Sequence, residues 1–379
     1  MDALGKLRLL GQAAQYEPAE DVGMTGQRWP MARAPEELVD CISHAATPKG
    51  RIPLLKTLLS SACERDCYYC PFRTGRDFRR ATFTSDELAK LFIQLYQHDF
   101  VEGLFISSGL VGGGPKTQDR ILATAEILRR RYHFRGYIHL KIMPGAERDQ
   151  VAAGMALADR VSVNLEAPND GRLARLAPHK IFTEELLQRM TWVEEIRQAH
   201  GGYGPSMTTQ FVVGAAGESD LELLHTTHYL NRHLRLARAY FSGFNPIEDT
   251  PLEEVPPASM EREHRLYQAS FLLRDYSFDL EELPFARDAN LPLHEDPKLL
   301  WARQHLSEAP VEINCADRET LLRVPGIGVK SADRIVAARR QGALRDLSHL
   351  RQLHIAAQRA APFILLDGKR PARQLRLPL

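Results

Sequence analysis

The sequence has little cysteine, almost no net charge and no long apolar run. Only 5 of its 379 residues are Cys, too few and too unevenly spread for a disulfide framework. Lys and Arg number 49 and Asp and Glu 48, so the overall charge indicates no particular partner. No segment approaches the roughly 20 apolar residues that span a membrane, and the first residues lack the apolar core of a secretion signal. We therefore expect a globular, cytoplasmic protein that does not enter a membrane.

What the sequence does contain is a regular alternation of strand and helix patterns. From Arg51 onward, short apolar or β-branched runs alternate with amphipathic stretches, which is typical of strand–helix units around a parallel sheet. Strands are expected at 52–59, 103–107, 137–142, 161–165, 207–213 and 239–244. A capping box at Thr84 begins the clearest helix, and further helices are expected near 117–131, 147–157, 183–199, 218–232 and 258–275.

These six units predict an α/β fold, a partial (β/α)6 barrel over residues 51–282. A doubly wound sheet is the alternative, and in either fold ligands gather at the carboxyl ends of the strands. Residues 1–50 are then an N-terminal extension. The Pro-containing segment 283–310 is expected to wrap around the core or link it to a module that follows.

Three of the cysteines, Cys63, Cys67 and Cys70, lie together at CxxxCxxC spacing. They directly follow the first expected strand, which places them on the first loop at the mouth of the barrel. Three thiolates from one loop can bind three irons of a 4Fe-4S cluster and leave the fourth iron without a protein ligand. The alternative is a structural zinc site, which needs a fourth ligand, and His44 is the nearest upstream candidate. The spacing and position favour the cluster.

The CxxxCxxC spacing, with an aromatic residue before the last cysteine, resembles the signature of the radical-SAM superfamily. The resemblance covers roughly residues 51–280 and implies a second cofactor, S-adenosyl-L-methionine (SAM), at the open iron. There, one electron from the cluster would cleave SAM to a 5′-deoxyadenosyl radical. The residues that the resemblance implies for contact with SAM are Tyr69, Ser107, Ser108, Gly109, Asn164, Glu166 and Gly214.

The last part of the chain is a separate basic module. Residues 311–379 contain 13 Lys or Arg and 6 Asp or Glu, a net charge of +7 against +1 for the whole chain. Asn314 is expected to cap a short helix that ends near Arg323, and a second helix is expected from Val329 to Gln341. The seam between these helices would be formed by Leu321, Leu322, Ile335 and Val336.

This helix pair resembles the helix-hairpin-helix of DNA-binding proteins, over residues 311–366. Glycines in the turn let the backbone approach a phosphate closely, and the first amides of the second helix favour an anion. The expected nucleic-acid-binding residues are Pro325, Gly326, Ile327, Gly328, Lys330 and Arg334. The alternative is a helix pair used only for packing or protein contacts. Residues 367–379 are a basic tail that includes Lys369, Arg370, Arg373 and Arg376.

Taken together, the two signals resemble a bacterial family of DNA modification or repair radical-SAM proteins associated with uracil-DNA-glycosylase-like proteins. The matching stretches are CYYCPF, SSGL, SVNLEAPN, NLPLHEDPKLLW and VPGIGVKSADRIV. The resemblance implies DNA as the target, a uracil-DNA-glycosylase-like partner, and a reductase, flavodoxin or ferredoxin as electron donor. RNA is the alternative polymer, and a structural or redox-sensing cluster is the alternative to catalysis. Candidates for a hydrogen-donating residue are Tyr203, Tyr240 and Cys41.

Overall fold

The computed structural model describes residues 1–14, 36–47 and 50–371. The chain divides into two compact units, which are described separately. Unit 1 comprises Met1–Glu218 and Tyr229–Ser259, and unit 2 comprises Ser219–His228 and Met260–Leu379. Arg373 and Arg376 of the expected basic tail lie outside the described residues. The domain limits expected from the sequence stay predictions.

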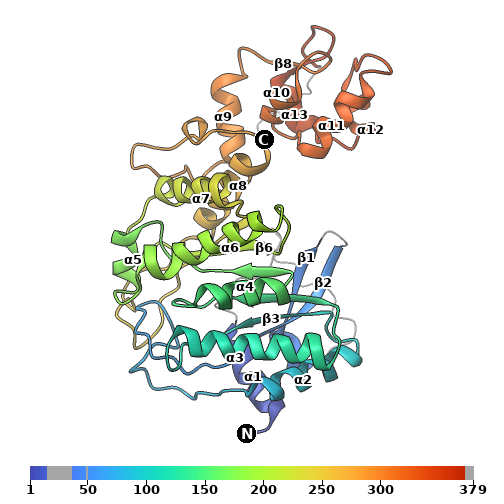
Figure 1. The fold of residues 1–379 in the computed structure, drawn as a ribbon. Coiled ribbons are helices and arrows are strands. Elements are labelled where there is room, and N and C mark those ends of the chain that lie inside the picture. The colour runs from blue at the N-terminus through green and yellow to red at the C-terminus, as the bar shows by residue number, and fades with distance from the viewer. Residues whose placement is uncertain (15–35, 48–49, 372–379) are drawn as a thin grey trace. The chain divides into compact units, whose positions relative to one another are not determined.

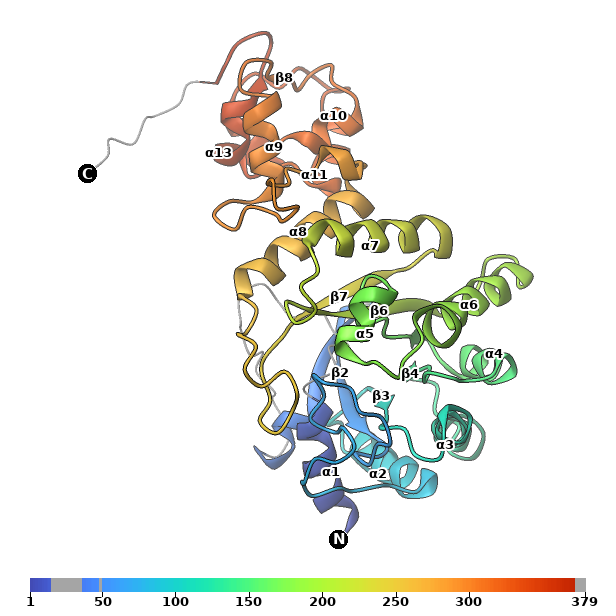
Figure 2. The same ribbon diagram turned by 90° about the vertical axis from the view of Figure 1, so that its left-hand side faces the viewer.

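Unit 1 is built on a curled, open sheet of seven strands in the order β1 to β7 (Figure 2). The strands are β1 (Ile42–Thr47), β2 (Gly50–Leu58), β3 (Gly103–Ser107), β4 (Tyr137–Lys141), β5 (Arg160–Ser162), β6 (Ser206–Val213) and β7 (Arg238–Gly243). Strands β2 to β7 are all parallel, and each pairs with the next along the chain. This unbroken order has no point at which the direction of winding reverses, so the sheet is a half-barrel and not a doubly wound sheet.

All six expected strands are present, and the sequence prediction missed one more. Strand β1 pairs antiparallel with β2, with Ile42 opposite Leu55 and Thr47 opposite Gly50. Only two residues separate the strands, which makes them a hairpin rather than a strand–helix unit. The sequence ISHAAT has one large aliphatic residue and no clear alternation, so its pattern did not distinguish it from a loop.

Helices cover the outer face of this sheet, where α2, α3, α4 and α6 lie side by side (Figure 2). The helical segments of unit 1 are α1 (Ala3–Ala13), η2 (Glu36–Cys41), α2 (Ser85–Gln97), α3 (Gly114–Glu126), η3 (Ile127–Arg131), α4 (Arg148–Leu157), α5 (Asp170–Leu176), η4 (Phe182–Leu187) and α6 (Gln188–Ala199). The predicted capping box is confirmed: the Thr84 hydroxyl accepts from the Glu87 amide, and the Glu87 carboxylate accepts from the Thr84 amide. No helix among the described residues combines the length and apolarity needed to cross a bilayer.

Alternate residues of the strands face the helices and the concave side of the sheet. Leu104 and Ile106 of β3 belong to the apolar core that also contains Leu88 and Phe92 of α2. The intervening residues therefore line the concave side. There the register aligns one residue from each of four neighbouring strands in a single layer: Lys56, Phe105, His139 and Arg160. The concave side is thus largely polar and basic at this level.

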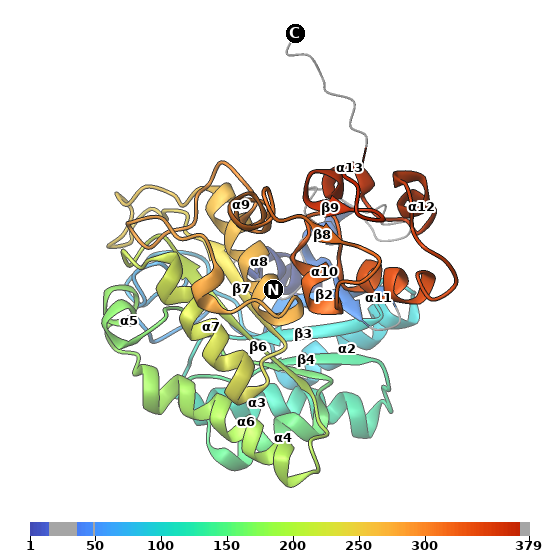
Figure 3. The same ribbon diagram turned by 90° about the horizontal axis from the view of Figure 1, so that it is seen from above.

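Unit 2 is mainly helical (Figure 3). Its elements are the start of α7 (Asp220–Leu234), α8 (Met260–Asp275), η5 (Leu280–Glu282), α9 (Pro297–His305), β8 (Val311–Glu312), α10 (Arg318–Arg323), α11 (Val329–Ala338), α12 (Leu347–Gln352), α13 (Ala357–Ala360), η6 (Ala361–Phe363) and β9 (Ile364–Leu365). Helix α9 lies within the segment 283–310 that was expected to be a wrap or linker. A compact apolar core includes Leu321, Leu322 and Ile335, and Val336 packs against it, as the predicted seam requires.

The predicted cap of the first helix in this region was wrong. Helix α10 begins at Arg318, and its N-cap is Asp317, whose carboxylate accepts from the Thr320 amide at 2.7 Å. Asn314 instead exchanges two hydrogen bonds with the backbone of Leu344, at 3.0 and 2.8 Å. Asp and Asn are equally good caps, so residue type alone could not choose between the two positions.

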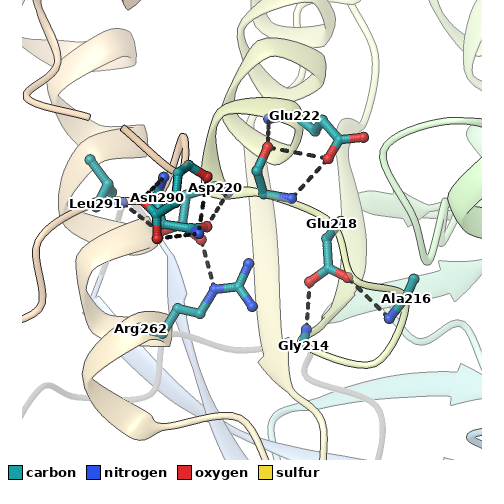
Figure 4. A network of polar contacts seen from close by, with 10 residues as sticks. Gly214, Ala216, Glu218, Asp220, Glu222, Arg262, Asn290 and Leu291 are labelled. Atoms are coloured by element: carbon teal, nitrogen blue, oxygen red, sulfur yellow. Dashed lines mark hydrogen bonds and ion pairs between the residues drawn. The ribbon is translucent and has the colours of Figure 1, made fainter. Parts of the chain in front are cut away.

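A buried carboxylate fixes the start of α7 within unit 2 (Figure 4). Asp220 is fully buried and accepts from Arg262 Nε at 2.7 Å and from the Leu291 amide at 2.9 Å. Its own amide donates to the Asn290 side chain at 3.0 Å. These bonds join three segments that are far apart in the sequence, and they give the stretch from Asn290 onward a structural role.

Candidate active site

A cavity of about 390 Å³ opens at the carboxyl ends of the parallel strands of unit 1. This is the size of a typical small-molecule site, at the end of the strands where such sites occur. Its lining includes Leu58, Ser107, Lys141 and Gly243, each at or next to the last residue of a strand. The lining also includes all three cysteines and six of the seven residues expected to contact SAM: Tyr69, Ser107, Ser108, Gly109, Asn164 and Glu166.

Gly214, the seventh, follows β6 but is not among the described residues that line the cavity. Its amide donates to the Glu218 carboxylate at 2.5 Å, and the same carboxylate accepts from the Ala216 amide at 3.1 Å (Figure 4). Glu218 is only 4% exposed, so its buried carboxylate stabilises the turn after β6 through these two hydrogen bonds. Contact between Gly214 and SAM stays a prediction.

The loop that carries the cysteines is fixed to the end of β3. The Gly109 amide donates to the Ser60 carbonyl at 2.7 Å, and the Glu64 amide donates to the Leu110 carbonyl at 2.8 Å. The Glu64 carboxylate also accepts from the amides of Gly112 and Gly113, at 3.0 and 2.9 Å. Two glycines of the triple-glycine run therefore serve to bind the cysteine loop.

Arg80 holds the same loop from its other end. Its guanidinium donates to the carbonyls of Ser61, Phe72, Arg73 and Arg76, at 3.1 to 3.2 Å. These carbonyls lie on both sides of the cysteine triplet in the sequence. The rigid fork of donors on Arg can satisfy several acceptors at once, which the Lys ammonium cannot do with the same geometry. Nothing in the sequence distinguished Arg80 from its three neighbouring arginines.

The environment of the thiols suits a cationic cluster. Backbone amides donate to two of the sulfurs, Leu110 N to Cys63 Sγ and Phe72 N to Cys70 Sγ, both at 3.4 Å. Burial and the neighbouring Cys67 raise the pKa of the Cys70 thiol well above its ordinary value. A positively charged group that binds the thiolates would remove this cost, and hydrogen bonds to sulfur are typical of iron–sulfur sites.

The triplet is not arranged for a single ion. Within the described residues, no three His, Cys, Asp or Glu side chains could together hold one metal ion. A 4Fe-4S cluster binds each thiolate through a different iron and so accommodates a wider triplet. The donor set therefore fits a cluster held by Cys63, Cys67 and Cys70, which would supply the electron that cleaves SAM.

A buried ion pair lies beside the cysteines. Lys180 Nζ donates to Glu166 Oε1 at 3.1 Å and to the Tyr69 hydroxyl at 3.3 Å. The side chains of Lys180 and Glu166 are only 9% and 7% exposed. Burial lowers the pKa of Lys180, but Cys67 and Glu166 raise it by more, so the ammonium keeps its charge. Lys180 thus joins two predicted SAM-contacting residues, and the sequence reasoning missed it.

Glu166 takes part in this pair in an uncommon backbone conformation. Its φ is +65°, in the left-handed region that residues other than Gly seldom adopt. Hydrogen bonds hold it there: its amide donates to the Gln210 carbonyl at 2.9 Å, and its carbonyl accepts from the Val212 amide at 2.8 Å. Such strain is often found at functional sites, and here it turns the carboxylate toward Lys180.

The three candidates for hydrogen donation are not among the residues that line the cavity. Tyr203 is 81% exposed on the loop before β6, whereas Cys41 is 1% exposed and donates to the Leu7 carbonyl. Tyr240 is 2% exposed within β7. The geometry of the cavity favours none of them.

Replacing Gly109 with alanine is expected to destabilise the cysteine loop. A Cβ at this position would lie 2.2 Å from the Ala62 carbonyl oxygen and 3.1 Å from Cys63 Cβ. Overpacking of this kind costs about 1–3 kcal/mol, so we expect a lower melting temperature and less iron per chain after reconstitution. Gly171→Ala is the control, because its Cβ would meet only Asn169 Oδ1, at an ordinary 3.6 Å. Equal iron content in the two variants would contradict the close packing described for Gly109.

Comparison with known proteins decides the family. Residues 57–230 match the sequence model of the radical SAM superfamily. This region of the chain therefore belongs to that superfamily. A 4Fe-4S cluster and SAM are the cofactors typical of this superfamily, as expected from the cysteine spacing for the cluster and from the resemblance for SAM. No curated protein matches the chain.

The chain is also similar to several solved structures. The methylornithine synthase PylB is 11% identical with a TM-score of 0.47, and the alignment covers 70% of this chain and 66% of that one. HydG, a maturase of the [FeFe]-hydrogenase, is 13% identical with a TM-score of 0.45, over 57% and 48%. The radical SAM methyltransferase TsrM from Kitasatospora setae is 13% identical with a TM-score of 0.40, over 55% and 48%. The chain thus spans half to two thirds of these proteins.

Proposed function

We propose that this radical SAM enzyme acts on DNA, in base modification or repair, and that α10 and α11 of unit 2 form a helix-hairpin-helix that binds the phosphate backbone. The observation that carries the proposal is the turn between these helices. Gly326 has φ +85°, and a Cβ there would lie 2.8 Å from the Ala356 carbonyl oxygen, so only glycine fits. The turn is therefore tight and closely packed against the second helix pair.

The start of α11 offers amides to an anion. The first intrahelical bond of α11 runs from the Ala332 amide to the Gly328 carbonyl, so the amides of Val329, Lys330 and Ser331 precede it. Gly328 is the N-cap and has no side chain to satisfy them. Lys330 is exposed beside these amides. A backbone phosphate satisfies such amides and is favoured there by the helix dipole.

The remaining expected contact residues divide into two groups. Pro325 and Ile327 are buried, so only their backbone is available to a ligand. Arg334 is exposed, but its guanidinium donates to the Leu353 carbonyl at 3.1 Å. We therefore assign the phosphate contact to the backbone of the turn and to Lys330, with Arg334 contributing mainly its charge.

A buried lysine stabilises the turn between α10 and α11 through a hydrogen bond to its backbone. Lys298 of α9 is 9% exposed, and its Nζ donates to the Ile327 carbonyl at 2.6 Å. Burial lowers the pKa of Lys298 to about 7. Its ammonium also lies 4.6 Å from the centroid of the Tyr276 ring, and the Tyr276 hydroxyl lies against Gly328. Lys298 belongs to the NLPLHEDPKLLW stretch. One role of this stretch is therefore to stabilise the turn between α10 and α11.

Charge also supports a polyanionic ligand, since residues 311–379 carry a net charge of +7. Contacts to phosphate do not read sequence, so the module would position DNA, and the cavity of unit 1 would select the target. The proposal includes a reductase, flavodoxin or ferredoxin as electron donor and a uracil-DNA-glycosylase-like protein as partner. RNA presents the same phosphates and is the second candidate.

Reversing the charge of Lys330 is expected to weaken DNA binding. Lys330→Glu places a carboxylate beside the phosphate site, so the Kd for a labelled duplex should rise about tenfold or more, as measured by fluorescence anisotropy with the full chain. Arg340→Glu is the matched control, since it makes the same charge change at an exposed position beyond the other end of α11. Gly326→Val tests the turn itself, with circular dichroism to verify folding.

Equal weakening by Lys330→Glu and Arg340→Glu would indicate a diffuse charge effect and overturn the assigned site. Tighter binding to a matched RNA than to DNA would favour the second candidate. The function itself is tested by 5′-deoxyadenosine formation from SAM, with and without DNA. Stimulation by DNA is expected, and the absence of any effect of DNA would contradict the proposal.

A further inference from the structure

The segment that follows the third cysteine is rich in arginine. Residues 71–80 (PFRTGRDFRR) contain four arginines and a single acidic residue, Asp77. We refer to Arg73, Arg76, Arg79 and Arg80 as the arginine rim. It lies in unit 1, away in the sequence from the basic module of unit 2.

The arginine rim belongs to the loop that borders the cavity, and two of its members are bonded to the cavity wall. Pro71 and Phe72 line the cavity, and their carbonyls accept from the rim: Arg76 Nη1 donates to Pro71 O at 3.1 Å and Arg80 Nη1 to Phe72 O at 3.2 Å. The guanidinium groups of Arg76 and Arg80 are therefore bonded to the backbone that forms this side of the cavity wall.

The charges of the rim are not neutralised within the protein. Within the described residues, none of the four arginines makes an ion pair with a carboxylate, whereas Arg65 of the same loop pairs with Glu185 at 2.5 Å. Four cations at one edge of a cavity attract anions strongly, because their fields add and the cavity wall has a low dielectric constant.

Two of the four arginines, Arg73 and Arg79, have hydrogen-bond donors that remain available to a ligand. Arg80 donates to four carbonyls and Arg76 to two, which makes both of them part of the loop. Arg79 is exposed and has no hydrogen-bond partner among the described residues. Arg73 lies over the Tyr68 ring, 5.8 Å from its centroid, and its Nε is buried without a partner. An unpaired buried donor is costly, and a ligand acceptor would satisfy it.

We propose that Arg73 and Arg79 bind the phosphates that flank the nucleotide entering the cavity. This rests on the proposed function, a nucleic-acid substrate, and adds a second phosphate site beside the chemistry. A planar guanidinium matches a phosphate with two parallel hydrogen bonds. Each nucleoside of a strand has a phosphate on either side, so a nucleoside within the cavity places two phosphates at its entrance. An acidic electron-donor protein is the alternative ligand, which the test below distinguishes.

The test uses the reconstituted full chain and a fluorescein-labelled single-stranded 20-mer of DNA, titrated at several KCl concentrations. The rim variant is Arg73→Gln with Arg79→Gln. We expect its Kd to rise about tenfold and the slope of log K against log salt to fall by about 1.4, or 0.7 for each phosphate that the variant no longer neutralises. The control is Arg120→Gln with Arg135→Gln, which removes two exposed arginines elsewhere in unit 1. It should match the unaltered chain in both quantities.

A rim variant that retains its melting temperature but binds like the control would overturn this inference and leave the proposed function intact. No binding by the unaltered chain would overturn both. If the rim variant binds DNA normally but is reduced more slowly by flavodoxin, and not by titanium(III) citrate, the arginine rim is a docking site for the electron donor and the inference is wrong.

Discussion

Replacing Cys67 with alanine is expected to abolish the cleavage of SAM. Cys67 is 6% exposed, which makes it the most buried of the three cysteines. Its thiol interacts electrostatically with Lys180 and Glu166. Two thiolates cannot hold the three irons that the triplet binds, so the cluster is lost or incomplete, and no electron reaches SAM. Formation of 5′-deoxyadenosine under anaerobic reduction should fall to background, a loss of about three orders of magnitude or more.

Cys315→Ala provides the control for this experiment, since Cys315 is an exposed thiol in unit 2. It should retain the iron content and the activity of the unaltered chain. Cys67→Ala should still bind DNA, because the phosphate contacts are assigned to other residues. Undiminished cleavage of SAM in the Cys67 variant would refute the assignment of the cluster ligands.

Replacing Lys180 with methionine is expected to have the second largest effect. It removes one partner of a buried ion pair and leaves Glu166 uncompensated, close to Cys67 and Cys70. Breaking a buried pair in this way costs about 3–5 kcal/mol. We expect the melting temperature of the full chain to fall by roughly 10 °C, and the yield of reconstituted cluster to fall with it.

The double variant Lys180→Met with Glu166→Gln separates pairing from packing. Removing both charges leaves no buried charge unpaired, so the double variant should be more stable than Lys180→Met alone. A matched control is Lys90→Met, a change of the same type at an exposed position on α2. A double variant less stable than the single one would show that the Glu166 charge stabilises the fold without Lys180.

The half-barrel could be predicted because residues close together in the sequence determine its strands and helices. Strand β3 contains GLFIS, a short run of apolar residues between turn signals, and its limits were predicted to the residue. Helix α2 begins with a capping box that involves residues three positions apart. The cysteine triplet is equally local, since one loop supplies all three thiols.

Features that depend on contacts between distant residues could not be predicted. Lys180 meets Tyr69 across 111 positions, and no pattern around HKIF indicates a buried ammonium. Gly109 lines the cavity and its contact with SAM stays a prediction, but its close packing against the cysteine loop could not be predicted from the sequence. Asn314 and Asp317 are interchangeable as caps by residue type, and the pairing of Asn314 with Leu344, 30 positions away, decided between them.

The open order of the sheet has a consequence for the shape of its interior. In a closed barrel the number of strands and their stagger fix the radius, so the lumen cannot widen without breaking hydrogen bonds. Here β1 and β7 stand at opposite ends of the hydrogen-bonded order, and no such closure condition applies. The curvature is set by what the strands pack against on either face, including the layer of Lys56, Phe105, His139 and Arg160. Strand number and stagger therefore do not fix the width of the concave side, and its contents and the covering helices do.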